Sequence, residues 1–103
     1  MNDSEISFSE RVYTIVAQIP CGKVATYGDI AKRSGNVKAA RAVGMCMNKN
    51  RDTYRVPCHR VVASTGELTG YAFGGVEAKR KKLLEEGIVF VGDRVDLKKS
   101  EWK

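Results

Sequence analysis

The chain has 103 residues, 43% of them hydrophobic, and carries 18 Lys and Arg against 12 Asp and Glu for a formal net charge of +6. That length suits one domain with one modest core, and no apolar run approaches the length of a membrane span. The positive charge favours a polyanionic partner such as a nucleic acid, although many basic proteins bind none.

The first element in chain order is a predicted helix over 8–18. Its apolar residues recur at helical spacing, with Ser7 or Ser9 as the capping residue. The five residues at the amino terminus are acidic and polar, which is not the pattern of a signal peptide. A turn over 19–23, which contains Pro and Gly, is expected to end the helix.

Two further short helices are predicted in the amino-terminal half. Thr26 is a typical N-cap, with Asp29 three residues later, and begins a helix over 27–33. The sequence Ser-Gly-Asn at 34–36 breaks this helix, and another is expected over 38–48. Two short helices joined by a turn that contains glycine form a helix-turn-helix pattern.

The carboxy-terminal half predicts a mixture of strands and one helix. A β-hairpin is expected over 61–69, and two short strands over 88–91 and 94–97. Between them lies a basic amphipathic helix over 75–86, whose predicted inward residues are Val76, Leu83 and Leu84. The expected fold is therefore mainly α with a small β-hairpin, a winged helix-turn-helix in a single domain spanning 1–103.

The helix predicted over 38–48 has an unusual surface. Small residues surround Arg41, namely Ala39, Ala40, Ala42 and Gly44. A helix that reads the major groove normally carries several long polar side chains. Two interpretations stay open: this face approaches DNA closely and inserts Arg41 into the base stack, or its small residues pack against a neighbouring helix.

Basic residues gather at two turns. One group comprises Lys32, Arg33, Lys38 and Arg41, and the other Lys49, Arg51, Arg55 and Arg60. Both groups are candidate contacts with a polyanion. The run over 79–82 is interpreted more simply as the solvated face of a helix.

The three cysteines are Cys21, Cys46 and Cys58, an odd number at wide spacing with no Cys-x-x-Cys pair. With His59 as the only histidine, neither a metal site nor a metal cofactor is expected. Free thiols suit a reducing compartment, so we expect the protein in the cytoplasm, or in the nucleus of a eukaryote.

The stretch over 56–61, Val-Pro-Cys-His-Arg-Val, is the strongest candidate site. A thiol is a strong nucleophile only as a thiolate, so it needs a base or a positive neighbour. His59, Arg60 and Arg55 all lie within three residues of Cys58. In an extended segment adjacent side chains point apart, so His59 would act through a water or from a turn. The alternative is a buried structural cysteine beside a surface histidine.

Taken together, the motifs resemble the DNA-binding, catalytic domain of the O6-alkylguanine-DNA alkyltransferases over nearly the whole chain. The matching residues are Pro-Cys-His-Arg-Val at 57–61, Ile-Pro-x-Gly-x-Val-x-Thr-Tyr-Gly at 19–28, Ala-Arg-Ala-Val-Gly at 40–44, Asn50, Gly-x-Leu-x-Gly-Tyr at 66–71, and Lys-x-x-x-Leu-Leu-x-Glu-Gly at 79–87.

The resemblance implies a suicidal repair protein that needs no cofactor. Cys58 would accept the alkyl group, His59 would deprotonate it through a bound water, and Glu86 would orient His59. Asn50 would hold the turn before the active-site segment. Because the thioether product resists hydrolysis, each molecule would act once.

The resemblance also implies a surface that flips the damaged base into a pocket. Arg41 would fill the gap left by the base, and Tyr27 would rotate the target phosphate. Thr26, Ala40, Ala42 and Gly44 complete this predicted DNA-binding set. The predicted pocket residues are Met47, Val61 and Tyr71, with Lys79 contacting the nucleotide or supporting the pocket loop. The implied partner is double-stranded DNA containing O6-alkylguanine, bound by a monomer away from any membrane.

Two departures keep alternatives open. The chain is as short as the alkyltransferase-like proteins, which bind alkylguanine without repairing it and usually have tryptophan or alanine in place of the acceptor cysteine. Cys58 favours transfer, with a non-catalytic sensor as the alternative. In the loop over 71–75, Phe73 stands where a serine-containing loop is common and would narrow or reshape the pocket. A winged-helix transcription regulator is a third, weaker interpretation.

Overall fold

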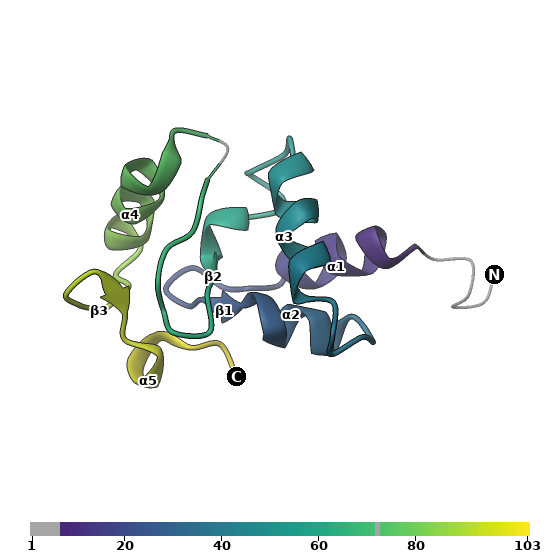
Figure 1. Cartoon of the computed structure of the whole chain (residues 1–103). Helices are drawn as coiled ribbons and strands as arrows, with labels where there is room; N and C mark the ends of the chain where they lie inside the picture. Colours follow the sequence, from purple (N-terminus) through teal and green to yellow (C-terminus); the bar gives the residue numbers. More distant parts are fainter. Residues whose placement is uncertain (1–6, 72) are drawn as a thin grey trace.

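Three helices form one side of the molecule (Figure 1). They are α1 (Phe8–Val16), α2 (Tyr27–Arg33) and α3 (Ala40–Lys49), and α2 and α3 form the predicted helix-turn-helix pair. The computed structural model describes residues 7–71 and 73–103. The three helices confirm the elements expected in this half, with ends shifted by one or two residues.

The helix starts follow the capping residues. The Ser7 Oγ accepts the backbone N–H of Glu10 at 3.1 Å, so Ser7 and not Ser9 caps α1. The Thr26 Oγ1 accepts the N–H of Asp29 at the same distance and begins α2. By contrast, α3 follows Ala39, which offers no side-chain cap.

The main core lies between the three helices and the short strands. Val12, Val16, Ile30 and Val43 are completely buried there. Among the apolar residues at helical spacing in and just after the first helix, Val12, Val16 and Ile19 are buried. Phe8 and Ile15 are only partly buried. Burying such side chains is the main stabilising term, about 1.5–3 kcal/mol each.

The central strands correct one prediction. β1 (Ala25–Thr26) pairs in parallel with β2 (Val61–Val62), so residues 61–63 do not form the first arm of a hairpin over 61–69. The expected turn does exist, since the Ala63 N–H donates to the carbonyl of Glu67 at 3.0 Å. Glu67 then bridges to Arg94 instead of continuing along β2.

The other side of the molecule contains α4 (Gly75–Glu85) and the antiparallel pair β3 (Phe90–Val91) and β4 (Arg94–Val95). The predicted strands are present but shorter. A last helical turn, α5 (Leu97–Ser100), was not predicted. Figure 1 shows β1 and β2 lying between this side and the three helices.

The chain end is tied to β1. The Val24 N–H donates to the Ser100 carbonyl at 2.9 Å, and the Trp102 N–H donates to the Val24 carbonyl at 2.7 Å. The Arg33 guanidinium stacks on the Trp102 ring, 4.0 Å from its centroid. The end of the chain therefore packs against α2 and helps to fix the helix that carries Tyr27.

The inward face of α4 differs from its prediction. Leu83 is buried as expected, but Val76 and Leu84 are 42% and 53% exposed. Lys79, expected within a solvated basic run, is only 1% exposed. Lys79 and Leu83 are four residues apart and share one helix face, which here points into the protein. No helix in the described part of the chain is long and apolar enough to cross a membrane.

The turn over 63–66 generates a stability prediction. Gly66 has φ +88°, and a Cβ there would collide with the carbonyl oxygen of Val95. Gly66→Ala should therefore lower the free energy of unfolding by about 1–3 kcal/mol in a denaturant titration. Gly70→Ala is the matched control, because a Cβ at Gly70 meets nothing within 4 Å. Equal effects of the two changes would contradict the predicted close approach.

Candidate functional site

Cys58 lies in a tight turn and not in an extended segment. It opens the 3-10 turn η2 (Cys58–Arg60), which the Arg60 N–H closes by donating to the Pro57 carbonyl at 2.9 Å. The side chain is 4% exposed and belongs to the same hydrophobic cluster as Met47, Val61 and Tyr71. The thiol is thus held inside the protein, in one cluster with three of the residues predicted to form a base pocket.

His59, the residue after Cys58, belongs to an ionic network. The His59 Nε2 lies 2.9 Å from the Glu86 Oε2. Arg60 donates to both oxygens of the same carboxylate, from Nε at 2.9 Å and from Nη2 at 2.7 Å. Its Nη1 also donates to the Ile19 carbonyl at 2.8 Å. Such a bidentate pair fixes orientation as well as charge, so Glu86 holds the imidazole in one position.

Burial controls the protonation of this network. Burial lowers the pKa of His59 below its ordinary value, although the hydrogen bond from His59 to Glu86 opposes this. Burial would raise the pKa of Glu86, but the hydrogen bonds from Arg60 and His59 outweigh it and lower that pKa. The His59 Nδ1 is buried and has no hydrogen-bond partner among residues 7–71 and 73–103. A neutral imidazole with a free nitrogen can accept a proton.

Asn50 holds the segment that leads into Cys58. Its Nδ2 donates to the Val56 carbonyl at 2.9 Å, and its Oδ1 accepts the Asp52 N–H at 3.1 Å. Asn50 is buried at the end of α3. The geometry is that of a brace for the turn before the active-site segment; its effect on chemistry stays a prediction.

Lys79 brings a buried amine to the same region. Burial lowers the pKa of Lys79 to about 8, and interaction with a Cys58 thiolate would raise it. Its Nζ is 3.5 Å from the hydroxyl of Tyr27 and lies over the ring of that tyrosine, 5.7 Å from the centroid. Lys79 thus links α4 to the first residue of α2.

The loop after the predicted pocket carries a pair of aromatic rings. Tyr71 and Phe73 have centroids 5.6 Å apart and planes tilted by 59°. Burial raises the pKa of Tyr71. Ala72 lies outside the described residues. Phe73 therefore backs a ring of the predicted pocket, and its effect on the size of that pocket stays a prediction.

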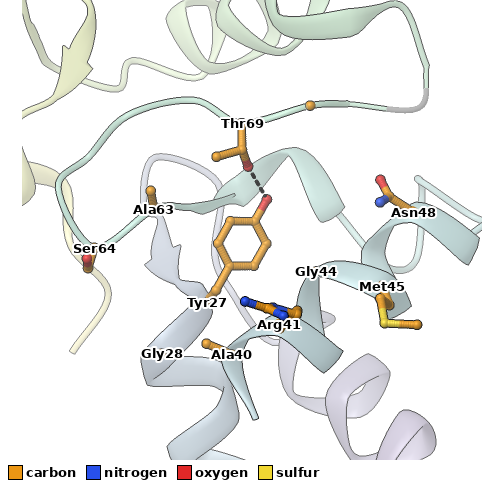
Figure 2. Close-up of a pocket in the computed structure, with 11 residues that line it drawn as sticks. Tyr27, Gly28, Ala40, Arg41, Gly44, Met45, Asn48, Ala63, Ser64 and Thr69 are labelled. Carbon is orange, nitrogen blue, oxygen red and sulfur yellow. Dashed lines mark hydrogen bonds between the residues drawn. The ribbon is translucent and has the colours of Figure 1, made fainter. Parts of the chain in front are cut away.

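An open groove of about 630 Å³ lies between α3 and the segment over 63–70 (Figure 2). Tyr27 crosses this groove, and its hydroxyl is 2.7 Å from the Thr69 Oγ1. Arg41 is exposed and lies on the groove side of α3. Its guanidinium makes no hydrogen bond or ion pair with the described part of the chain. An arginine without a partner beside a groove is available to a ligand.

The small residues around Arg41 divide between the two interpretations, because Ala39 packs against the core while Ala40 and Gly44 face the groove. Ala40 and Gly44 line the groove with Arg41, and a Cβ added at Gly44 would meet nothing within 4 Å. Ala42 and Thr26, also predicted to bind DNA, do not line it. The Thr26 hydroxyl is used to cap α2, so Thr26 acts on this surface by placing Tyr27.

In the second basic group only Arg60 is withdrawn into a part-buried ion pair, while Lys49, Arg51 and Arg55 are exposed. Arg60 is bound to Glu86, Arg51 donates to the carbonyls of Asn48 and Asn50, and Arg55 lies 3.8 Å from Asp52. Sequence spacing cannot show such pairing. The first group remains largely exposed, apart from the ion pair of Arg33 with Asp29 at 2.8 Å.

Several groove residues were missed by sequence reasoning. They are Gly28, Met45, Asn48, Ala63, Ser64, Thr69 and Gly70. The spacing of α3 signals Met45 and Asn48, because they lie four and seven residues after Arg41 and so share its helix face. The residues after β2 give no such signal, because only the fold brings them to α3.

The chain is similar to proteins of one known family over most of its length. A model described as "6-O-methylguanine DNA methyltransferase, DNA binding domain" matches residues 7–88. A methylated-DNA–protein-cysteine methyltransferase of Methanosarcina mazei is 52% identical over 67 residues, which cover 65% of this chain and 42% of that protein.

Two relatives match almost the whole chain. A DNA base-flipping protein of Escherichia coli is 41% identical over 97% of this chain and 78% of its own length. The S. pombe protein Atl1, crystallised with damaged DNA containing O6-carboxymethylguanine, is 33% identical with a TM-score of 0.79, covering 100% of this chain and 99% of Atl1. By contrast, the chain spans only 29% to 51% of three methyltransferase relatives.

The Glu86 network predicts how His59 titrates. Because His59 is the only histidine, an NMR titration follows it without ambiguity. Its pKa should lie below the ordinary value of 6.5. Glu86→Gln should lower it further, since the carboxylate favours the imidazolium, and the neighbouring Glu85→Gln should leave it unchanged.

The pH dependence of the protein's stability follows from the same lowering of the His59 pKa. The pKa of His59 is lower in the folded than in the unfolded protein, so His59 contributes to the free energy of unfolding in full above pH 6.5. This contribution is lost as the pH falls through the folded-state pKa. A His59 pKa at or above 6.5 would contradict the burial of the imidazole.

Proposed function

The chain belongs to the family of the 6-O-methylguanine DNA methyltransferase DNA-binding domain, and on that premise we propose that it binds duplex DNA containing O6-alkylguanine and transfers the alkyl group to its own Cys58. The observation that carries this proposal is the placement of Cys58 in a rigid turn whose next residue, His59, is held by Glu86 at 2.9 Å. This arrangement supports the proposal because the carboxylate orients a candidate base, and that base directly follows the candidate nucleophile in the chain.

The groove supplies the proposed DNA contact. Its small residues allow close approach of the sugar–phosphate backbone, and the unpaired Arg41 fills the space of the extruded base. Tyr27 stands at the N-terminus of α2 between this groove and Lys79. The base then enters beside Met47, Val61 and Tyr71, which belong to the same hydrophobic cluster as Cys58.

The proposed reaction is a direct displacement. His59 takes the thiol proton, directly or through a water, and the Cys58 sulfur attacks the alkyl carbon. The carbon–O6 bond breaks as the sulfur–carbon bond forms, and guanine leaves with the electron pair and regains one proton. Arg60 and Glu86 act as positioning residues, because they fix His59 and touch no reacting atom.

The second candidate is a protein that binds O6-alkylguanine and flips it without transfer. It is supported by the two relatives that match almost the full chain, the E. coli base-flipping protein and S. pombe Atl1. The two candidates share the groove and Arg41 and differ only in the chemistry of Cys58. In both, the protein acts as a monomer in a reducing compartment, the cytoplasm or a nucleus.

The reaction predicts a single covalent product. After incubation with excess duplex that contains one O6-methylguanine, intact mass spectrometry should show one addition of about 14 daltons, located at Cys58, because a thioether has no leaving group for turnover. Cys58→Ser should bind this duplex without gaining mass, whereas Cys21→Ser, at an exposed cysteine, should gain it normally.

The other outcomes separate the candidates. Unmodified protein that still prefers the damaged duplex would establish the non-catalytic function. Unmodified protein with no preference for damage would reject both.

The proposed role of Arg41 predicts how its removal changes the preference for damaged DNA. Arg41→Ala should reduce the preference for damaged over undamaged duplex by about 1–3 kcal/mol, the scale of one unstacking step. The matched control is Lys38→Ala, an exposed cation just before α3, which should weaken binding to both duplexes alike. Equal losses on both duplexes for Arg41→Ala would make it an ordinary phosphate contact.

A further inference from the structure

A second groove lies on the far side of the turn over 63–66. It has a volume of about 550 Å³ and is bounded by Thr65, the β3–β4 hairpin and the first turn of α5. Val91, Val95 and Leu97 contribute its apolar part, and Arg94 and Lys98 its cationic part. The family match ends at residue 88, so all of these residues except Thr65 lie beyond it, and none has a role in the chemistry proposed above.

The hairpin is joined rigidly to the turn. The Val95 N–H donates to the Gly66 carbonyl at 2.9 Å, and Glu67 forms a β-bridge with Arg94. A side chain at Gly66 would collide with Val95, so the two backbones are in direct contact. A ligand that touches the turn is therefore at a fixed distance from Arg94.

The turn is shared by both grooves. Ala63 and Ser64 line the groove that contains Arg41, and the next residue, Thr65, lines the second groove. Figures 1 and 2 both show the carboxy-terminal segment running beside this turn. The two grooves therefore meet at this turn.

The cations of the second groove are available. Arg94 and Lys98 are exposed, and neither side chain forms an ion pair within residues 7–71 and 73–103. Asp93 binds Arg80 at 2.7 Å, and Asp96, which also lines the groove, accepts the backbone N–H of Lys98 at 3.1 Å. The lining therefore contains one more cation than carboxylate. Two free cations beside a binding groove complement a phosphate backbone.

We propose that Arg94 and Lys98 form a second contact with the sugar–phosphate backbone of the same duplex, outside the groove that takes the damaged base. This inference rests on the proposed function, since it requires a duplex in the first groove. The hairpin then acts as a wing that adds affinity without distinguishing damaged from undamaged DNA, because phosphates carry no sequence information.

The test measures duplex affinity against salt for Arg94→Glu/Lys98→Glu. The slope of log affinity against log salt should fall by about 1–2, and affinity in dilute salt should fall on the order of tenfold, equally for undamaged duplex and for duplex with one O6-methylguanine. The milder Arg94→Gln/Lys98→Gln should show the same direction and keeps the test valid if charge reversal unfolds the protein.

Lys81→Glu is the control for net charge and is compared with Arg94→Gln/Lys98→Gln, because each lowers the net charge by two. Lys81 is exposed and lies two residues after the buried Lys79, on the opposite face of α4. Unchanged binding in both double variants, or a loss equal to that of Lys81→Glu, would overturn the wing contact while leaving the proposed function intact. Wild-type protein that does not bind DNA would reject both, whereas a loss confined to damaged duplex would reject the wing alone.

Discussion

The Glu86 carboxylate joins three segments that are distant in sequence. It ends α4, accepts two hydrogen bonds from Arg60 and one from His59, and through Arg60 is linked to the carbonyl of Ile19 after α1. Removing one partner of such a part-buried network leaves the other charges uncompensated, which is costly. The position of His59, and with it the environment of Cys58, depends on this one carboxylate.

A second electrostatic element faces the thiol from α4. Lys79 is buried, its pKa is lowered to about 8, and an ammonium there and a thiolate at Cys58 stabilise one another. Because Lys79 also reaches Tyr27, the thiol and the groove are connected through one side chain.

The helices and most of their caps could be predicted because their signals are local: Ser7 and Thr26 stand where the spacing of apolar residues begins. The motif around Cys58 was also evident, and its resemblance to a family pointed to Glu86. The parallel pairing of residues 61–62 with 25–26 could not be predicted. The paired residues are 36 positions apart in the sequence, and the local pattern of turn residues favoured a hairpin instead.

Lys79 shows a second limit of sequence reasoning. Within a run of four basic residues its side chain looks solvated, and only the packing of α4 reveals its burial. Likewise, the pairing of Arg60 with Glu86 spans 26 residues, so spacing suggested a cation beside the thiol where the structure has a brace for the histidine. The sequence shows which side chains are charged, but only the folded structure shows which of them pair.

The most direct test of the account is the single-turnover rate of methyl transfer from duplex O6-methylguanine as a function of pH, in wild type, Glu86→Gln and Glu85→Gln. If Glu86 positions His59 as the base, the rate in Glu86→Gln should fall by about tenfold or more, and Glu85→Gln should match wild type. The wild-type rate should also decline as the pH falls through the pKa of His59. Equal rates in all three proteins, with no decline at low pH, would contradict the role given to Glu86 and His59.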